Sequence, residues 1–195
     1  MSAEATQAGL ASPLQPLTFE GGGSEALLLR DFSLARRAGV RGPGAREWLA
    51  SQGLPGDIAP NHISEESDQG LVMALSQREL WLLQPDAAAS SQQPDSAALV
   101  PGAWPLYCQH SHAWLVLSGE PKAAMMAKLC GVDLRDGAFP LGQVAQTQMA
   151  HVSVVIAHHR YQDGAVFSLF VDQSLAEYAA SALTDAMAEF NQPGN

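Results

Sequence analysis

Among the residue types that could bind a metal ion or catalyse a reaction, histidine has the most suggestive spacing in this chain. His110 and His112 would share one face if they lie on a strand, so the two imidazoles could chelate a metal ion. No Asp, Glu or Cys stands at a supporting spacing, and no His-Glu-x-x-His pattern is present. The adjacent His158 and His159 would point to opposite faces of a strand. We therefore expect structural or solvent-facing histidines, which argues against a stand-alone metal hydrolase.

The candidate nucleophiles and phosphate-binding loops also lack their usual surroundings. Ser111 is not part of a Gly-x-Ser-x-Gly elbow, and Cys130 follows a predicted helix, where the helix dipole disfavours a thiolate. The segment 39–44 is rich in glycine but lacks the Lys-Ser/Thr pair of a phosphate loop, which favours a tight turn. The sequence thus predicts no catalytic residue, no cofactor-binding residue and no metal ligand. The two cysteines, Cys108 and Cys130, are expected to be buried, reduced thiols.

The net charge of the chain limits the classes of partner that it could bind. The chain of 195 residues carries 10 Lys and Arg against 20 Asp and Glu, and its net charge of −10 would repel a phosphate backbone. We therefore expect no nucleic-acid partner. No run approaches the roughly 18 apolar residues that span a bilayer, and no basic start precedes an apolar stretch. These observations predict a cytoplasmic protein without a membrane partner.

Five of the ten basic residues fall within one 17-residue stretch: Arg30, Arg36, Arg37, Arg41 and Arg46. They could form a basic strip on an acidic body, suited to docking an acidic partner surface or an anionic ligand. They could equally belong to a solvated edge strand whose arginines discourage aggregation. The sequence leaves both interpretations open.

The chain divides into a tail, two lobes and a linker. Residues 1–24 are rich in Ala, Ser, Gln, Pro and Gly, which predicts a flexible N-terminal tail or one that orders against a partner. Residues 25–84 would form a first lobe, the polar and proline-rich residues 85–108 a linker, and residues 109–192 a second lobe. With 47% hydrophobic residues, the two lobes are expected to fold as one compact domain.

Hydrophobic periodicity predicts an α+β fold of mainly antiparallel strands. His112–Ser118 should be a buried strand in which Trp114 and Val116 face one way and the intervening residues the other. The last helix should begin at a capping box of Ser174 and Glu177. The other expected elements are extended segments at 26–29 and 33–40, a helix after Pro43, hairpins of 71–75 with 79–83 and of 151–157 with 165–171, and a helix over 122–129.

The two lobes look related. Gly42 and Gly119 each end a predicted strand, and a bulky apolar pair follows each glycine six and seven positions later. These pairs are Trp48-Leu49 and Met125-Met126. An internal duplication is the simplest explanation, so we expect two related sheet-and-helix lobes.

Several short motifs, taken in order, carry a family resemblance. The motifs are Ala38-Gly-Val-Arg-Gly-Pro-Gly-Ala45 with Leu49, Leu54-Pro55 before Pro60-Asn61, Cys130-Gly-Val-Asp-Leu134, Phe139-Pro-Leu-Gly142, Thr147, the strand Phe167–Val171 and the helix with Ser174, Tyr178 and Leu183. Over about residues 32–190 this order resembles the gamma subunit of heterotetrameric sarcosine oxidase. The second half also resembles the folate-dependent aminomethyltransferase (glycine-cleavage T-protein) superfamily, which implies its folate-binding-domain fold.

The resemblance implies a non-catalytic gamma subunit of a complex that oxidatively demethylates sarcosine to glycine. Alpha, beta and delta subunits would be its partners, and they would carry the FAD, FMN, NAD, tetrahydrofolate and zinc, so that this chain binds no cofactor itself. The chain departs from the family before its last helix, where Gln173-Ser-Leu175 replaces an Arg-Ser-Phe stretch. The alternatives are a gamma-type subunit of another N-methyl amino acid oxidase or dehydrogenase, and a stand-alone folate-binding or aminomethyltransferase-like module.

Overall fold

The computed structural model describes residues 12–14, 26–64, 70–85, 100–162 and 164–191. Within these residues the chain forms two five-stranded antiparallel sheets and three α-helices. We call the sheet of order β3-β4-β5-β2-β6 the N-sheet and the sheet of order β1-β7-β10-β9-β8 the C-sheet. The elements are β1 (Leu28–Asp31), β2 (Arg36–Arg41), α1 (Ala45–Ser51), β3 (His62–Ile63), β4 (Leu71–Ala74), β5 (Glu79–Gln84), β6 (Trp104–Leu106), β7 (His112–Ser118), α2 (Lys122–Met126), β8 (Val144–Met149), β9 (Val152–Tyr161), β10 (Gly164–Asp172), the short 3-10 helix η3 (Gln173–Leu175) and α3 (Ala176–Ala188).

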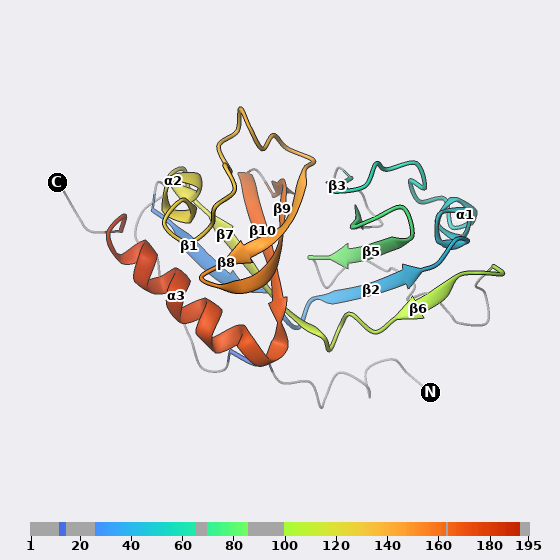
Figure 1. The fold of residues 1–195 in the computed structure, drawn as a ribbon, viewed down its shortest axis with the longest axis horizontal. Helices are drawn as coiled ribbons and strands as arrows, with labels where there is room; N and C mark the ends of the chain where they lie inside the picture. The colour runs from blue at the N-terminus through green and yellow to red at the C-terminus, as the bar shows by residue number, and fades with distance from the viewer. Residues whose placement is uncertain (1–11, 15–25, 65–69, 86–99, 163, 192–195) are drawn as a thin grey trace.

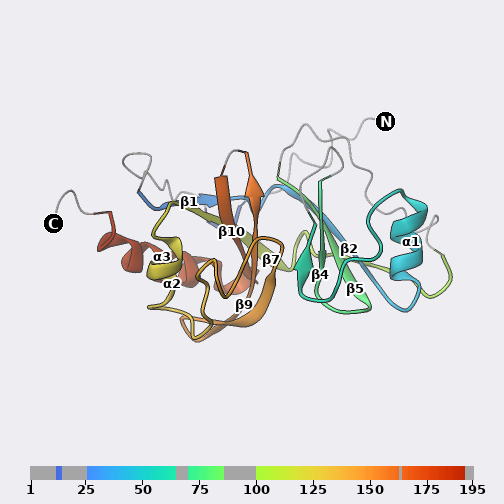
Figure 2. The ribbon, with the colours of Figure 1, turned by 90° about the horizontal axis from the view of Figure 1, so that it is seen from above.

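The elements stack in four layers. Helices α2 and α3 cover one face of the C-sheet, the other face of the C-sheet packs on the N-sheet, and α1 covers the far side of the N-sheet (Figures 1 and 2). Three apolar clusters fill the spaces between the layers. No helix in the described part of the chain is long and apolar enough to cross a membrane.

Strict alternation along the strands produces this stack. On β7, Ala113, Leu115 and Leu117 enter the core beneath α2 and α3. Trp114 and Val116 enter the core between the sheets, as the sequence predicts. Because both faces of this strand are buried, nearly every residue of β7 is apolar.

The two sheets repeat one plan, which confirms the expectation of two related sheet-and-helix lobes in an α+β fold. Each half of the chain runs strand, strand, helix and three further strands, and the two sheet orders match position by position. Gly42 and Gly119 have φ of +126° and +113°, a conformation that favours glycine. A Cβ at Gly42 would lie 2.1 Å from the oxygen of Gly102, and a Cβ at Gly119 would lie 2.6 Å from the oxygen of Ala26.

The first strand of each half lies in the sheet of the other half. β1 pairs with β7 in the C-sheet, and β6 pairs with β2 in the N-sheet. The lobes therefore differ from the expected boundaries of 25–84 and 109–192, because β1 belongs with the second lobe and β6 arises from the expected linker, 85–108. Of that linker, 86–99 lie outside the described residues, as does most of the expected tail, 1–24. Leu14, within that tail, is buried in the core beneath the helices.

Three local predictions differ from the structure. The edge strand β8 was not expected, because its polar Gln146, Thr147 and Gln148 obscure the alternation. Helix α2 ends at Met126, three residues before the predicted end. The predicted capping box is wrong: the Asp172 carboxylate accepts from the backbone N–H of Ser174 at 2.9 Å and caps η3 instead.

Buried hydrogen bonds stabilise the place where the segment that follows β1 passes the segment that follows β6. Arg37 is 2% exposed, and its guanidinium donates to the carbonyl oxygens of Ser33, Cys108, Gln109 and His112. The side-chain amide oxygen of Gln109 in turn accepts from the backbone N–H of Arg37 at 2.8 Å. We call this group of residues the crossing point. Burial lowers the pKa of Arg37 to about 10, so the group stays charged at neutral pH.

A second buried polar chain lies between the sheets. The Trp114 indole N–H donates to the Ser168 hydroxyl at 2.9 Å, and that hydroxyl donates to Nε2 of His159 at 2.7 Å. Nδ1 of His159 donates to the oxygen of Arg160 at 2.8 Å, so both ring nitrogens of a neutral imidazole are satisfied. Burial lowers the pKa of His159 from its ordinary 6.5 to about 4.

Removing the Arg37 guanidinium should destabilise the fold, because the carbonyl oxygens of Ser33, Cys108, Gln109 and His112 all lose a charged donor at buried or partly buried positions. We expect Arg37→Met to lower the free energy of unfolding by about 3 kcal/mol or more, since each orphaned buried group costs about 1–3 kcal/mol. Urea unfolding at neutral pH measures the change. The neighbouring Arg36→Met is the control and should shift stability by less than about 1 kcal/mol. Equal losses for the two variants would contradict a special role for Arg37.

Acid should destabilise the protein through His159. The folded-state pKa is lowered, so the unfolded chain binds more protons below pH 6.5, and this contribution to stability is lost as the pH falls from 6.5 towards 4. The expected loss is up to about 3 kcal/mol. Unfolding free energies measured from about pH 7 to 4.5 should fall less steeply in His159→Gln than in the parent. His112 and His158, whose pKa values burial also lowers, remain in both proteins. Identical slopes would refute the assignment to His159.

Candidate functional site

The structure separates the five arginines of the predicted docking strip. Arg30 is exposed on β1 in the C-sheet, whereas Arg36 and Arg41 stand at the two ends of β2 in the N-sheet. Arg37 is buried at the crossing point, so it is no docking residue. Arg41 and Arg46 come together at the turn between β4 and β5. A continuous strip of five does not form.

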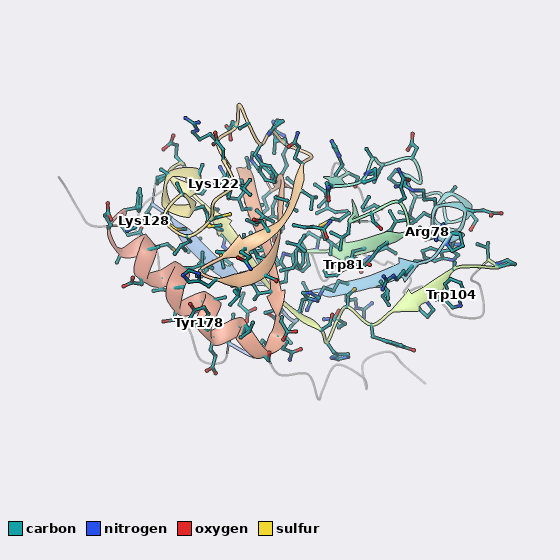
Figure 3. The ribbon with its side chains drawn as sticks, in the orientation of Figure 1. Arg78, Trp81, Trp104, Lys122, Lys128 and Tyr178 are labelled. Atoms are coloured by element: carbon teal, nitrogen blue, oxygen red, sulfur yellow. The ribbon has the colours of Figure 1, made fainter. Side chains whose placement is uncertain are left out.

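At that turn lies an open pocket of about 670 Å³, lined by Arg41, Gly42, Pro43, Ser76, Gln77, Arg78 and Trp104. Two guanidinium groups, from β2 and from the turn, thus line one pocket together with an indole ring, and Arg46 of α1 binds the turn from outside the pocket. We call Arg41, Arg46, Arg78 and Trp104 the arginine–tryptophan surface. Figure 3 shows Arg78 and Trp104 at the end of the molecule formed by the N-sheet, opposite the end that carries Lys128 and Tyr178.

Arg46 fixes the turn that carries Arg78. Its guanidinium donates to the oxygen of Gln77 at 3.0 Å and, on its other side, to the oxygens of Gly56 at 2.8 Å and Ile58 at 2.7 Å. Helix α1 is thereby tied both to the turn and to the segment that follows the helix. The base of the pocket is therefore rigid, although Arg46 itself is only partly exposed.

Trp104 is held in place while it faces solvent. Trp104 is 59% exposed. A Cβ built on Gly42 would nevertheless lie 2.6 Å from two atoms of its indole ring. The ring therefore rests directly against the Gly42 backbone. A large aromatic side chain that is both exposed and fixed loses little conformational entropy when a partner covers it.

The surface carries excess positive charge. Arg41 Nε lies 3.7 Å from Glu79 Oε2, and the Arg41 side chain remains 66% exposed. Arg78 forms no salt bridge with any acidic side chain among the described residues. Two arginines and no acidic side chain line the pocket, which makes it a positive patch on a chain whose net charge is −10.

A second hollow, of about 790 Å³, opens at the end of the C-sheet. It is lined by His112, Gln146, Thr147, Gln148, Ser153, Val154, Val155, Phe170, Asp172, Ser174 and Leu175. The mixture of amide, hydroxyl and carboxylate groups around Phe170 could hydrogen-bond a flat polar ligand. We call this hollow the His112 groove.

The His112 groove does not contain a nucleophilic triad. His112 Nδ1 lies 2.7 Å from the Ser111 hydroxyl, and the imidazole ring packs edge-on against Trp81 at 5.0 Å. Burial is the largest cause that lowers the pKa of His112. Asp172 takes the hydrogen bonds of Ser174, which lower the pKa of its carboxyl group, and it is not within hydrogen-bond distance of the imidazole. The required order of nucleophile, base and orienting acid is therefore missing.

The remaining sequence candidates are structural in the described part of the chain. Both cysteines are buried free thiols, as expected, and burial raises the pKa of Cys108 to about 11, so this thiol stays protonated at neutral pH. His158 and His159 lie on opposite faces of β9, as predicted, and Nδ1 of His158 donates to the oxygen of Phe139 at 2.8 Å. The described residues hold no group of three or more His, Cys, Asp or Glu that could bind a metal ion.

Sequence reasoning missed Arg78 and Trp104. Arg78 stands in a polar turn, and Trp104 stands in a proline-rich segment expected to be a linker. A tryptophan in such a segment is itself the signal that could have drawn attention, because a linker has no core in which to bury an indole. Its pairing with Arg41 required the β2–β6 register, which local sequence does not reveal.

Comparisons with known proteins show a likeness of fold. No protein-family model and no curated protein sequence matches the chain. A chain of the heterotetrameric sarcosine oxidase from Corynebacterium sp. U-96, solved with pyrrole 2-carboxylate, matches with a TM-score of 0.73 and 22% identity, covering 90% of this chain and 91% of that one. The glycine cleavage system aminomethyltransferase T from Bartonella henselae matches with a TM-score of 0.57 and 19% identity, covering 80% of this chain but 44% of that one. The chain therefore has the α+β fold that the resemblance implied, and it has this fold over almost the whole length of a sarcosine oxidase chain.

Proposed function

We propose that this chain is the non-catalytic gamma subunit of a cytoplasmic, heterotetrameric sarcosine oxidase-like complex that oxidatively demethylates sarcosine to glycine. One observation carries the proposal: the fold matches a chain of a heterotetrameric sarcosine oxidase across nine tenths of both chains. Because the match covers nearly all of both chains, it relates this whole chain to that whole chain. The match to aminomethyltransferase T covers under half of that enzyme, so it relates this chain to one part of a larger protein.

The arrangement of side chains is consistent with an accessory role. The His112 groove lacks a triad, Cys108 is held as a thiol, and the buried histidines bond to neighbouring groups. In the proposed complex, alpha, beta and delta subunits hold the FAD, FMN, NAD, tetrahydrofolate and zinc. This chain contributes shape and surface to the assembly, and the fixed arginines and tryptophan at the end of the N-sheet are the kind of residues that dominate protein interfaces.

A second candidate function is a stand-alone folate-binding or aminomethyl-transferring module. The His112 groove favours it, because the Asp172 carboxylate, the Ser153 hydroxyl and the exposed Gln148 amide on its lining could hydrogen-bond a flat heterocycle. The likeness to aminomethyltransferase T agrees with this alternative. A gamma-type subunit of another N-methyl amino acid oxidase or dehydrogenase would share the first proposal's structural basis and differ only in the substrate of the complex.

Co-expression tests the subunit proposal. The tagged chain is produced together with alpha-, beta- and delta-type subunits from the same organism, and the product is separated by size-exclusion chromatography. We expect the chain to co-elute in equal amounts with the other subunits and to carry no flavin absorbance when it is purified alone. A chain that elutes as a monomer beside an intact, fully active complex would rule the proposal out.

Titration of the isolated chain with tetrahydrofolate separates the two candidate functions. The subunit proposal predicts no binding tighter than about 1 mM, which corresponds to only about 4 kcal/mol. The module alternative predicts micromolar binding that Asp172→Asn weakens at least about tenfold, because a charge-assisted hydrogen bond is lost. Asp185→Asn, an exposed change on α3 outside the groove, is the matched control. Calorimetry provides the measurement.

A further inference from the structure

We infer that the arginine–tryptophan surface binds an acidic segment of a partner subunit. The inference rests on the proposed function and adds to it the place of contact and the chemistry of the partner. It is carried by three features that meet in one pocket of about 670 Å³: two exposed arginines, an exposed aromatic ring and a turn held by hydrogen bonds.

Charge selects the partner. The body of the chain is acidic, so two exposed guanidinium groups at one end create a local field of opposite sign to the rest of the surface. Arg41 shares a long ion pair of 3.7 Å with Glu79, which a partner carboxylate could replace, and Arg78 has no such pairing in the described part of the chain. An acidic segment would find attraction here and repulsion over most of the remaining surface.

Preorganisation makes the site suited to stable binding. Arg46 fixes the turn of Arg78 through the oxygen of Gln77, and the Gly42 backbone supports the ring of Trp104. Binding would therefore order few additional side chains, and little of the interaction energy would be lost to entropy. Tryptophan and arginine are also the residues most enriched among those that dominate interface affinity. Arginine further offers two parallel donors to each carboxylate.

The partner segment is recognised through side chains and not by extending the N-sheet. β6 is an edge strand of three residues, and Pro105 in its middle has no N–H to donate. Such an edge is a poor template for another strand. The outer side of β6 instead presents the exposed Trp104, and Tyr107 follows the strand with 81% of its surface exposed.

The experiment uses the full chain and the co-purified alpha, beta and delta subunits. Their affinity for the parent, Arg41→Glu/Arg78→Glu and Trp104→Ala is measured by biolayer interferometry at low and raised NaCl. The matched control is Arg30→Glu/Arg160→Glu, which makes the same change of charge at two exposed arginines of the C-sheet. Urea unfolding confirms that each variant is folded.

We expect the Arg41→Glu/Arg78→Glu variant to bind at least about 30-fold more weakly, and Trp104→Ala about 10-fold more weakly. The control should stay within about 3-fold of the parent, because its two arginines lie in the C-sheet, outside the arginine–tryptophan surface. Added salt should weaken the parent more than the double arginine variant.

Three other results would overturn the inference. Unchanged binding by both pocket variants would leave the complex intact but place the contact elsewhere. Equal losses in the pocket variant and the C-sheet control would show that only total charge matters. Failure of the parent to bind any subunit would refute the proposed function itself; if the parent then bound a labelled single-stranded oligonucleotide through Arg41 and Arg78, the partner would be a nucleic acid instead.

Discussion

The bonds around Arg37 are the interaction on which the architecture depends. Each half of the chain sends its first strand into the sheet of the other half, so two connecting segments must pass each other between the sheets. At that place several backbone carbonyl oxygens are buried or partly buried. One guanidinium, with several donors in a rigid plane, satisfies carbonyls from both segments, and the Gln109 amide completes the set. The charge is buried because no neutral side chain offers so many donors at one point.

The sequence predicted the local elements well where periodicity was unambiguous. β7 begins and ends where expected, and its two faces enter the cores that alternation assigned to them. The hairpin of β4 and β5 and the duplication marked by Gly42 and Gly119 were also predicted. The exchange of β1 and β6 was not, because pairing between distant strands leaves no trace in local pattern. The start of α3 was misjudged because Asp172 caps the short helix η3, and α3 begins only at Ala176 without the expected capping box.

The candidate site was predicted only in part, for a similar reason. Counting arginines identified Arg41 and Arg46, but count and spacing treat all five arginines alike. Tertiary structure buries Arg37, moves Arg30 to the other sheet and adds Arg78 and Trp104 from segments distant in sequence. Polar turns and proline-rich segments carry weak signals because their conformation depends on what lies beside them.

The exchanged strands also decide when the molecule can fold during its synthesis. β6 is made after the other members of the N-sheet, and β1 must wait for its partner β7, which is made after β6. Neither sheet is therefore complete while the ribosome has produced only the first hundred residues or so. Because distant strands pair with each other, the protein has a high contact order. A high contact order slows folding and leaves unpaired strand edges exposed in the nascent chain. A nascent chain of this topology cannot present a finished surface to any other molecule until the last strands of both sheets have been made and have paired.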